Sequence, residues 1–294
     1  MAGPGTPLLS EPTVWSARLL AHLDKTYVYV AALTNRNYEG EARAGGTVKA
    51  FYVSDVTVSD YTGGWSDSDW AALSDNEVTI QIDQAKKILV KVPDVRDQFS
   101  VIDLIDQATQ RMAVAIGDAI DQYVASKYAE VASANQYGDD TTPVTVGLGN
   151  GETRPTVALV RLREVLAEAR APMTNPRVVV PVWFATMLSL ELGSRATQLG
   201  DRATQEGMVA PGFLGTFEGL QVYVSPNVPN TTGTKYKVLA GDPMITFASA
   251  IEKVETTRLQ NDFATGVKAL YVYGAKLPRG QYLALGTFNR GSYA

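Results

Sequence analysis

The chain has 294 residues, of which 45% are hydrophobic and 19% are charged, a composition typical of a folded protein with a real core. Its 26 Lys and Arg against 31 Asp and Glu give a net charge of −5, which argues against a protein whose main task is to neutralise phosphates. The absence of cysteine excludes disulfides, thiolate metal sites and cysteine nucleophiles, and the single histidine, His22, excludes multi-histidine metal sites.

The N-terminal residues predict an arm followed by a helix. The first dozen residues are rich in Gly and Pro and nearly uncharged, so they cannot bury enough surface to order themselves. Apolar residues then recur near helical spacing from Trp15 to Leu33, and a strand remains an alternative at Tyr27 to Val30. No signal peptide or apolar run long enough to span a bilayer occurs, so we expect a cytosolic chain without a membrane partner.

The next segment predicts a projecting hairpin. Apolar and polar residues alternate from Val48 to Val58 and return from Val78 to Ile82, and a further strand at Ile88 to Val92 ends at Pro93. A long polar tip, Tyr61 to Asn76, joins the first two strands. Two strands joined in this way cannot close a core by themselves, and we therefore expect them to project.

The tip carries Trp65, Trp70 and Leu73. A thin projecting hairpin cannot bury two tryptophans against itself, and large aromatic side chains on an extension are typical anchors for a partner surface. The alternative is a tip that folds back onto its own domain. We favour contact with a partner.

The clearest element is a long helix from Asp103 to about Val131, with apolar residues at three- and four-residue spacing. About thirty residues at 1.5 Å each would make a rod of roughly 45 Å. The helix ends in a stretch rich in Gly, Asp, Asn and Thr, Asn135 to Thr153, which indicates a linker or flexible loop.

A compact mixed α/β unit follows. We expect a helix over Pro155 to Ala169, a strand buried on both faces over Arg177 to Val182, a helix over Phe184 to Leu192 and a surface loop over Gly193 to Pro211. Further strands are predicted at Leu220–Val224, Tyr236–Ala240, Val267–Ala275 and Gln281–Thr287.

Few patterns suggest chemistry. The glycines of Gly147 to Gly151 resemble a phosphate-binding loop, but no Gly-Lys-Ser/Thr ending and no preceding buried strand accompany them, so we interpret them as a linker. His22 is interpreted as a partly buried structural residue. Asn230-Thr231-Thr232 matches a glycosylation acceptor and is interpreted as a turn.

Three carboxylate pairs share a helix face by their spacing: Asp103 with Asp106, Asp118 with Asp121, and Glu164 with Glu168. Acid/base chemistry would need such a pair in a cleft with separated pKa values. Because apolar positions alternate with them, we expect solvated or intersubunit charges. We therefore expect no catalytic residues, no metal site and no cofactor.

Several segments together resemble the major capsid proteins of tailed bacteriophages, which have the Hong Kong 97 phage-type fold. The most specific runs from Gly212 to Pro229 and holds two glycines, an apolar strand and the pattern Ser225-x-Asn227-x-Pro229. Further similarities lie in WSARLL and LDK near the N-terminus, NRNYEGE from Asn35, and IEKVE and LYVYGAK near the C-terminus.

The resemblance implies an α+β fold with five parts. They are an N-terminal arm and first helix (1–34), an extended loop (35–96), a spine helix of a peripheral domain (97–134), an axial domain (135–248) and closing strands of the peripheral domain (249–294). The predicted elements occur in the same order along the chain.

The resemblance also implies a structural protein whose copies form pentamers and hexamers of an icosahedral or prolate shell. That shell would enclose double-stranded DNA without sequence-specific binding, be assembled in the host cytoplasm with scaffolding and portal proteins, and end in the virion. The candidates for contacts between subunits are Trp65, Trp70, Leu73, Arg36, Tyr38 and Glu39. Some relatives join subunits covalently through a loop lysine, but no lysine occurs from Ala50 to Ala85, so we expect a noncovalent shell.

Two other readings stay open. An encapsulin-like compartment shares the fold and packages enzymes instead of DNA. An α/β enzyme could use Asp201, Glu206 and Asp242, although the projecting hairpin and the lack of a histidine or cysteine constellation count against it.

Overall fold

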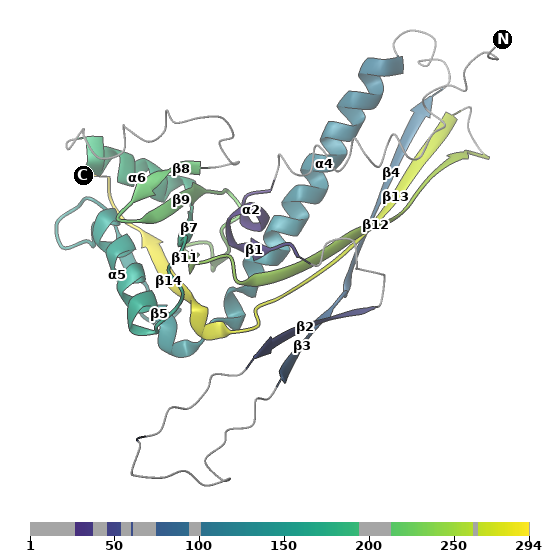
Figure 1. Cartoon of the computed structure of the whole chain (residues 1–294). Helices are drawn as coiled ribbons and strands as arrows, with labels where there is room; N and C mark the ends of the chain where they lie inside the picture. Colours follow the sequence, from purple (N-terminus) through teal and green to yellow (C-terminus); the bar gives the residue numbers. More distant parts are fainter. Residues whose placement is uncertain are drawn as a thin grey trace.

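The computed structural model describes residues 27–37, 46–53, 60, 75–93, 101–193, 213–260 and 264–293. These residues form an α+β fold with a four-stranded, an eight-stranded and a two-stranded sheet (Figure 1). The predicted arm, most of the predicted first helix, the hairpin tip and the loop 194–211 lie outside the described residues.

The long helix is confirmed as α4 (Val101–Ala125), which continues as the 3-10 helix η3 (Ser126–Glu130). Its side chains at three- and four-residue spacing enter the main core, as an amphipathic pattern requires. They are Met112, Ala113, Ile116, Ile120 and Val124. We call α4 the spine helix.

The four-stranded sheet runs beside the spine helix, in the order β1-β12-β13-β4 (Figure 1). Its strands are β1 (Thr34–Asn35), β12 (Ile245–Arg258), β13 (Ala264–Lys276) and β4 (Gln84–Pro93). Ile88 and Val90 of β4 pack against the main core to which the spine helix contributes. One face of this sheet is therefore turned toward α4.

The predicted hairpin forms a separate two-stranded sheet, β2 (Thr47–Val53) with β3 (Asp75–Gln81), which we call the flap. Its antiparallel register runs from Thr47 opposite Gln81 to Val53 opposite Asp75. Figure 1 shows the flap on the side of the four-stranded sheet away from α4, projecting from the body as predicted. The predicted strand over residues 88–92 is not part of the flap, because β4 pairs with β13.

The eight-stranded sheet has the order β5-β14-β11-β7-β9-β8, and β10 and β6 pair with β11 and β14. The predicted buried strand is confirmed as β7, whose Val178, Val179 and Val180 are fully buried. The elements of this unit are β5 (Gln136–Tyr137), β6 (Val144–Val146), α5 (Pro155–Glu168), β7 (Arg177–Val180), α6 (Val182–Gly193), β8 (Phe213–Phe217), β9 (Leu220–Val224), β10 (Asn230–Thr231), β11 (Lys235–Gly241) and β14 (Leu283–Arg290), with the 3-10 helices η4 (Ser133–Asn135) and η5 (Gly280–Tyr282).

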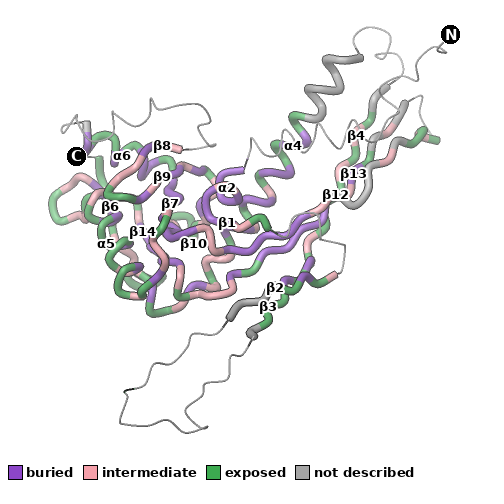
Figure 2. Tube along the Cα trace, viewed as in Figure 1, coloured by how far each residue is buried: buried purple, intermediate pink, exposed green. Residues whose placement is uncertain are grey.

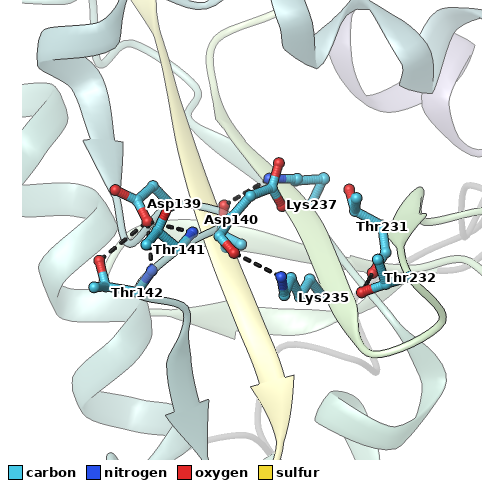
Figure 3. A network of polar contacts seen from close by, with 9 residues as sticks. Asp139, Asp140, Thr141, Thr142, Thr231, Thr232, Lys235 and Lys237 are labelled. Carbon is cyan, nitrogen blue, oxygen red and sulfur yellow. Dashed lines mark hydrogen bonds and ion pairs between the residues drawn. The ribbon is translucent and has the colours of Figure 1, made fainter.

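The prediction of a flexible linker over residues 135–153 is wrong. Both β5 and β6 pair in parallel with β14, so the segment closes one side of the eight-stranded sheet. The turn between them is held by two lysines of β11 (Figure 3). Lys235 Nζ donates to the backbone oxygen of Asp140 at 2.6 Å, and the Nζ of the buried Lys237 lies 2.8 Å from the carboxylate of Asp140. Polar composition favoured a loop, whereas long-range pairing decides the structure.

The last strands do not stay together, which differs from the expected grouping of residues 249–294. The strands β12 and β13 lie in the four-stranded sheet, but β14 lies beside β11 in the eight-stranded sheet. All residues from Leu283 to Phe288 are buried there. A strand buried in this way completes the core of the second unit.

The strand alternative at Tyr27–Val30 is also wrong, since residues 29–33 form the short helix α2 (Tyr29–Leu33). Five residues are too few to hold a helix by themselves. The helix is instead stabilised by tertiary contacts, and Tyr29, Val30, Ala32 and Leu33 are fully buried.

Candidate assembly surfaces

The base of the flap is fixed to the four-stranded sheet by a small separate core. Val48 and Ile80 of the flap pack with Ile82, and Ala248 and Val272 of the sheet complete the cluster. Among the residues that the structure describes, the flap is anchored at its base, and its strands continue away from the body (Figure 1).

Gly274 of β13 permits the close approach of the flap. A Cβ at this position would lie 2.2 Å from the backbone oxygen of Gln81, at the end of β3. Real side chains never come so close to a backbone atom, so no residue larger than glycine fits without moving the strand.

Beyond the flap base, described residues on the same face of the four-stranded sheet are exposed, among them Lys87, Leu89 and Lys268. Leu89 of β4 is 68% exposed, although it lies in a strand of a long sheet. Exposed and intermediate residues follow each other along β4 (Figure 2). Leu89 lines a shallow hollow of about 350 Å³ that we call the Leu89 face, with Lys87, Lys268, Glu255, Ala269 and Leu270.

Two turns of the spine helix connect three parts of the molecule. Asp118 accepts a 2.6 Å hydrogen bond from the side-chain amide of Asn227, near the end of β9. Asp121 accepts hydrogen bonds from the start of α2. The hydroxyl of Tyr123 donates to Asp83, in the turn between the flap and β4. The spine helix is therefore the common support of the eight-stranded unit, α2 and the flap.

The Ser225-x-Asn227-x-Pro229 pattern has a structural role at this support. The backbone N–H of Asn227 donates to the hydroxyl of Ser225 at 3.1 Å, which forms a turn after β9. Asn227 then reaches Asp118, and the backbone oxygen of Pro229 accepts from Lys237. The motif thus joins β9, β11 and the spine helix.

The expectation that Asp121 is a solvated or intersubunit charge is wrong, because Asp121 is only 2% exposed. Its carboxylate accepts the backbone N–H of Val28 at 2.8 Å, of Tyr29 at 3.2 Å and of Val30 at 3.4 Å. Burial raises the pKa of Asp121 to about 6, although the backbone hydrogen bonds lower it. The sequence gives no signal for this role, since the partner lies far away in the chain.

The glycine-rich loop binds a carboxylate of its own chain rather than a phosphate. The backbone N–H of Gly149 and that of Ser292 each donate to the carboxylate of Glu152 at 3.0 Å. A Cβ at Gly147 would lie 1.9 Å from this carboxylate. The space that closely spaced glycines open for an anion is therefore filled from within.

The other carboxylates singled out in the sequence do not form a catalytic group. Glu164 and Glu168 are exposed on α5, as expected. Asp242 accepts the backbone N–H groups of Thr174 and Asn175 and thereby holds a loop. Among the described residues, no group of acidic or histidine side chains could hold a metal ion, and no helix is long and apolar enough to cross a membrane.

The described residues include only part of the predicted contact set. Arg36 is exposed just after β1. Tyr38, Glu39, Trp65, Trp70 and Leu73 lie outside the described residues, as do His22, Asp201 and Glu206; the side chains of Asp103 and Asp106 are also not described. Asn230 and Thr231 form β10, and Thr232 follows in a turn. Sequence reasoning missed the Leu89 face, for which the alternation of lysine and leucine in KKILVKV is the available signal.

Comparisons with known proteins agree with this architecture. The family model described as phage capsid protein matches residues 77–284. The solved structure from Mycobacterium phage Che8 is 27% identical, with a TM-score of 0.62 over 90% of this chain and 91% of that chain. The capsid of Ralstonia phage GP4 is 14% identical, with a TM-score of 0.67 over 90% of each chain.

A third similar structure is a virus-like particle from Pyrococcus furiosus. It is 12% identical, with a TM-score of 0.54 over 92% of this chain and 96% of that chain, and this likeness concerns the fold alone. No curated protein matches the sequence.

Proposed function

This chain belongs to the phage capsid protein family, and from that premise we propose that its copies build the shell by laying the flap of each copy over the Leu89 face of a neighbouring copy. The protein is a structural component of the virion capsid that associates with itself, and not an enzyme. The observation that carries the proposal is a pair of surfaces in the described part of the chain: a flap whose anchoring contacts lie at its base, and a sheet face beside it on which Leu89 is exposed.

Charge supports this pairing. From Ala50 to Ala85 the sequence has no Lys or Arg, and its acidic residues are Asp55, Asp60, Asp67, Asp69, Asp75, Glu77 and Asp83. Of these, Glu77 forms a 2.7 Å ion pair with Lys49 of β2, and the other six carry the negative charge of the proposed contact. The Leu89 face carries Lys87 and Lys268, of which Lys268 forms a 2.7 Å ion pair with Glu255 of the same face, and Lys91 lies further along β4. Because the Leu89 face keeps a net positive charge through Lys87, it favours an acidic flap, whereas two acidic flaps repel each other.

Apolar anchors supply the second part of the proposed contact. We place Trp65, Trp70 and Leu73 of the flap tip against the exposed Leu89 of a neighbour, with Arg36, Tyr38 and Glu39 at the rim. Covering a leucine side chain contributes about 1.5–3 kcal/mol. Each contact is modest, but a closed shell repeats it in every subunit, so that the contacts reinforce one another.

The larger assembly follows from the family. We propose pentamers and hexamers that close an icosahedral or prolate shell around double-stranded DNA, with scaffolding and portal proteins as assembly partners. We also propose the division into an arm with first helix (1–34), extended loop (35–96), spine helix (97–134), an axial domain (135–248) that β14 (Leu283–Arg290) completes, and closing strands from residue 249 to the end of β13 at Lys276. The position of β14 extends the axial unit by its last strand.

A charge reversal with rescue tests the proposed contact. Lys87→Glu should abolish assembly of the purified chain into shells, as seen by negative-stain microscopy, while leaving the circular dichroism unchanged. Lys86→Glu is the matched control, because this neighbour in β4 points to the opposite face. Reversing the charge of the flap tip with Asp67→Lys and Asp69→Lys should restore shell assembly in the Lys87→Glu variant. The pairing of flap and Leu89 face would be contradicted if Lys87→Glu formed normal shells, or if Lys87→Glu and Lys86→Glu lost shell assembly to the same extent.

The second candidate is an encapsulin-like compartment, favoured by the fold likeness to the virus-like particle from Pyrococcus furiosus. Both functions use a closed shell of identical subunits. Shells purified from the natural source would contain DNA if the first proposal is right and cargo protein if the second is right, which microscopy and nuclease treatment can distinguish.

A further inference from the structure

The segment from Tyr27 to Asn35, which we call the strap, passes between the two large parts of the molecule. It contains α2 and β1, and α2 contacts both the spine helix and β7 of the eight-stranded sheet (Figure 1). The strap ends on the four-stranded sheet, where Thr34 and Asn35 pair in parallel with Ile245 and Thr246. Figure 2 shows α2 buried at this junction.

The N-terminal end of α2 is held by the spine helix. The carboxylate of Asp121 faces the first free N–H groups of α2 and accepts hydrogen bonds from Val28, Tyr29 and Val30. The start of a helix carries a partial positive charge, so a carboxylate at this place is favourable.

The C-terminal end of α2 is held by the eight-stranded sheet. Arg177 is the first residue of β7, and its guanidinium donates to the backbone oxygens of Ala31 at 2.7 Å and Ala32 at 3.2 Å. These oxygens belong to the last turn of the helix, where a cation matches the partial negative charge. Opposite charges from two different units thus hold the two ends of one five-residue helix.

We propose that the strap fixes the angle between the spine helix and the eight-stranded sheet, and that Asp121 and Arg177 are positioning residues for shell assembly. Neither residue belongs to the flap or to the Leu89 face. Their effect on assembly is therefore indirect: a subunit with a loose strap would present its contact surfaces at variable angles. The part of this inference that concerns assembly rests on the proposed function.

Hydrogen exchange on the unassembled full chain tests the strap itself. Asp121→Asn and Arg177→Gln should each raise the exchange rate of the amides of residues 28–33 at least tenfold, while the amides of β14 keep their wild-type rates. Arg163→Gln is the control, because it removes an exposed ion pair with Glu218 and should leave the strap unchanged. Wild-type rates in the strap of both variants would overturn the inference.

A disulfide tests whether the strap acts on assembly by position. The chain has no cysteine, so Asn35→Cys with Thr246→Cys places one pair at directly opposite positions of β1 and β12. In the variant that combines this cysteine pair with Asp121→Asn, the reduced protein should fail to form regular shells, and the oxidised protein should form them again. Regular shells from Asp121→Asn with a loose strap, or no rescue by the disulfide, would overturn the inference. Because hydrogen exchange is measured on unassembled subunits, it tests the strap independently of the proposed contact between flap and Leu89 face. A wrong contact would therefore leave the exchange result unchanged.

Discussion

The hydroxyl of Tyr123 donates a 2.9 Å hydrogen bond to the carboxylate of Asp83, and so connects the spine helix with the turn through which the flap returns to the sheet. Tyr123 also packs edge-on against Tyr273 of β13, with ring centroids 5.2 Å apart. Burial, together with the hydrogen bond to Asp83, raises the pKa of Tyr123 well above its usual range. The hydroxyl thus stays protonated and remains a donor at physiological pH.

Removal of this hydroxyl should loosen the flap base. We expect Tyr123→Phe to lower the free energy of unfolding by about 1 kcal/mol, because the ring stays packed and one hydrogen bond is lost. Asp83→Asn keeps an acceptor oxygen and should cost less. Urea denaturation measures both, and a Tyr123→Phe variant as stable as the wild type would show that the bond contributes nothing.

Gly274 should not tolerate even alanine. The added methyl group would meet the backbone oxygen of Gln81, which cannot rotate away as a side chain can, so we expect Gly274→Ala to cost about 1–3 kcal/mol. Gly266→Ala is the matched control in the same strand, since its Cβ would have its nearest neighbour, a leucine methyl, at 3.4 Å. Equal melting temperatures for the two variants would contradict the close approach of the flap.

Stability should depend on pH through Asp121. Its pKa is about 6 in the folded protein and 3.8 as the ordinary value, so the folded state binds this proton more tightly than the unfolded chain. The contribution of protonated Asp121 to the free energy of unfolding is complete below about pH 4 and is lost as the pH rises through about 6. A shift of about two units corresponds to about 3 kcal/mol at most. The nearby charge of Asp118 also raises the pKa of Asp121, and burial together with the charge of Asp121 raises the pKa of Tyr29.

The lowered pKa values of Asp139 and Asp140 act on stability in the opposite direction. The effect should therefore be measured as the difference in unfolding free energy between wild type and Asp121→Asn at pH 4, 5, 6 and 7. The wild type should gain on the variant as the pH falls. A difference that is constant over this range would be inconsistent with a buried, titrating Asp121.

The shell should be held by noncovalent contacts. No lysine occurs from Ala50 to Ala85, so the flap tip lacks the amine that a covalent joint between subunits would need. Purified shells should migrate in SDS as single chains. Ladders of covalent oligomers would contradict this prediction.

Much of the fold was predictable because strong local patterns carried it. The spacing of Ile116, Ile120 and their neighbours defined the spine helix, and the continuous apolar run at Val178–Val180 defined the buried strand. The projecting flap followed from a physical constraint, since two strands with a long polar tip cannot enclose a core.

The failures concern residues whose role depends on distant partners. Asp121 lies beside Asp118 on a helix, a pattern that usually indicates solvated charges, but α2 covers it. The residues of β5 and β6 are polar and rich in turn formers, but β14 supplies their hydrogen bonds. The pattern KKILVKV hinted at the Leu89 face, but the structure was needed to show that Ile88 and Val90 pack on the core and that Leu89 is exposed.

A density map of the assembled shell by electron cryomicroscopy tests the central claim most directly. The proposed assembly predicts that the flap of one subunit lies across the Leu89 face of the next, with Trp65 or Trp70 near Leu89 and acidic flap residues near Lys87. A map in which the Leu89 face is open to solvent, or is covered by the flap of its own subunit, would contradict it.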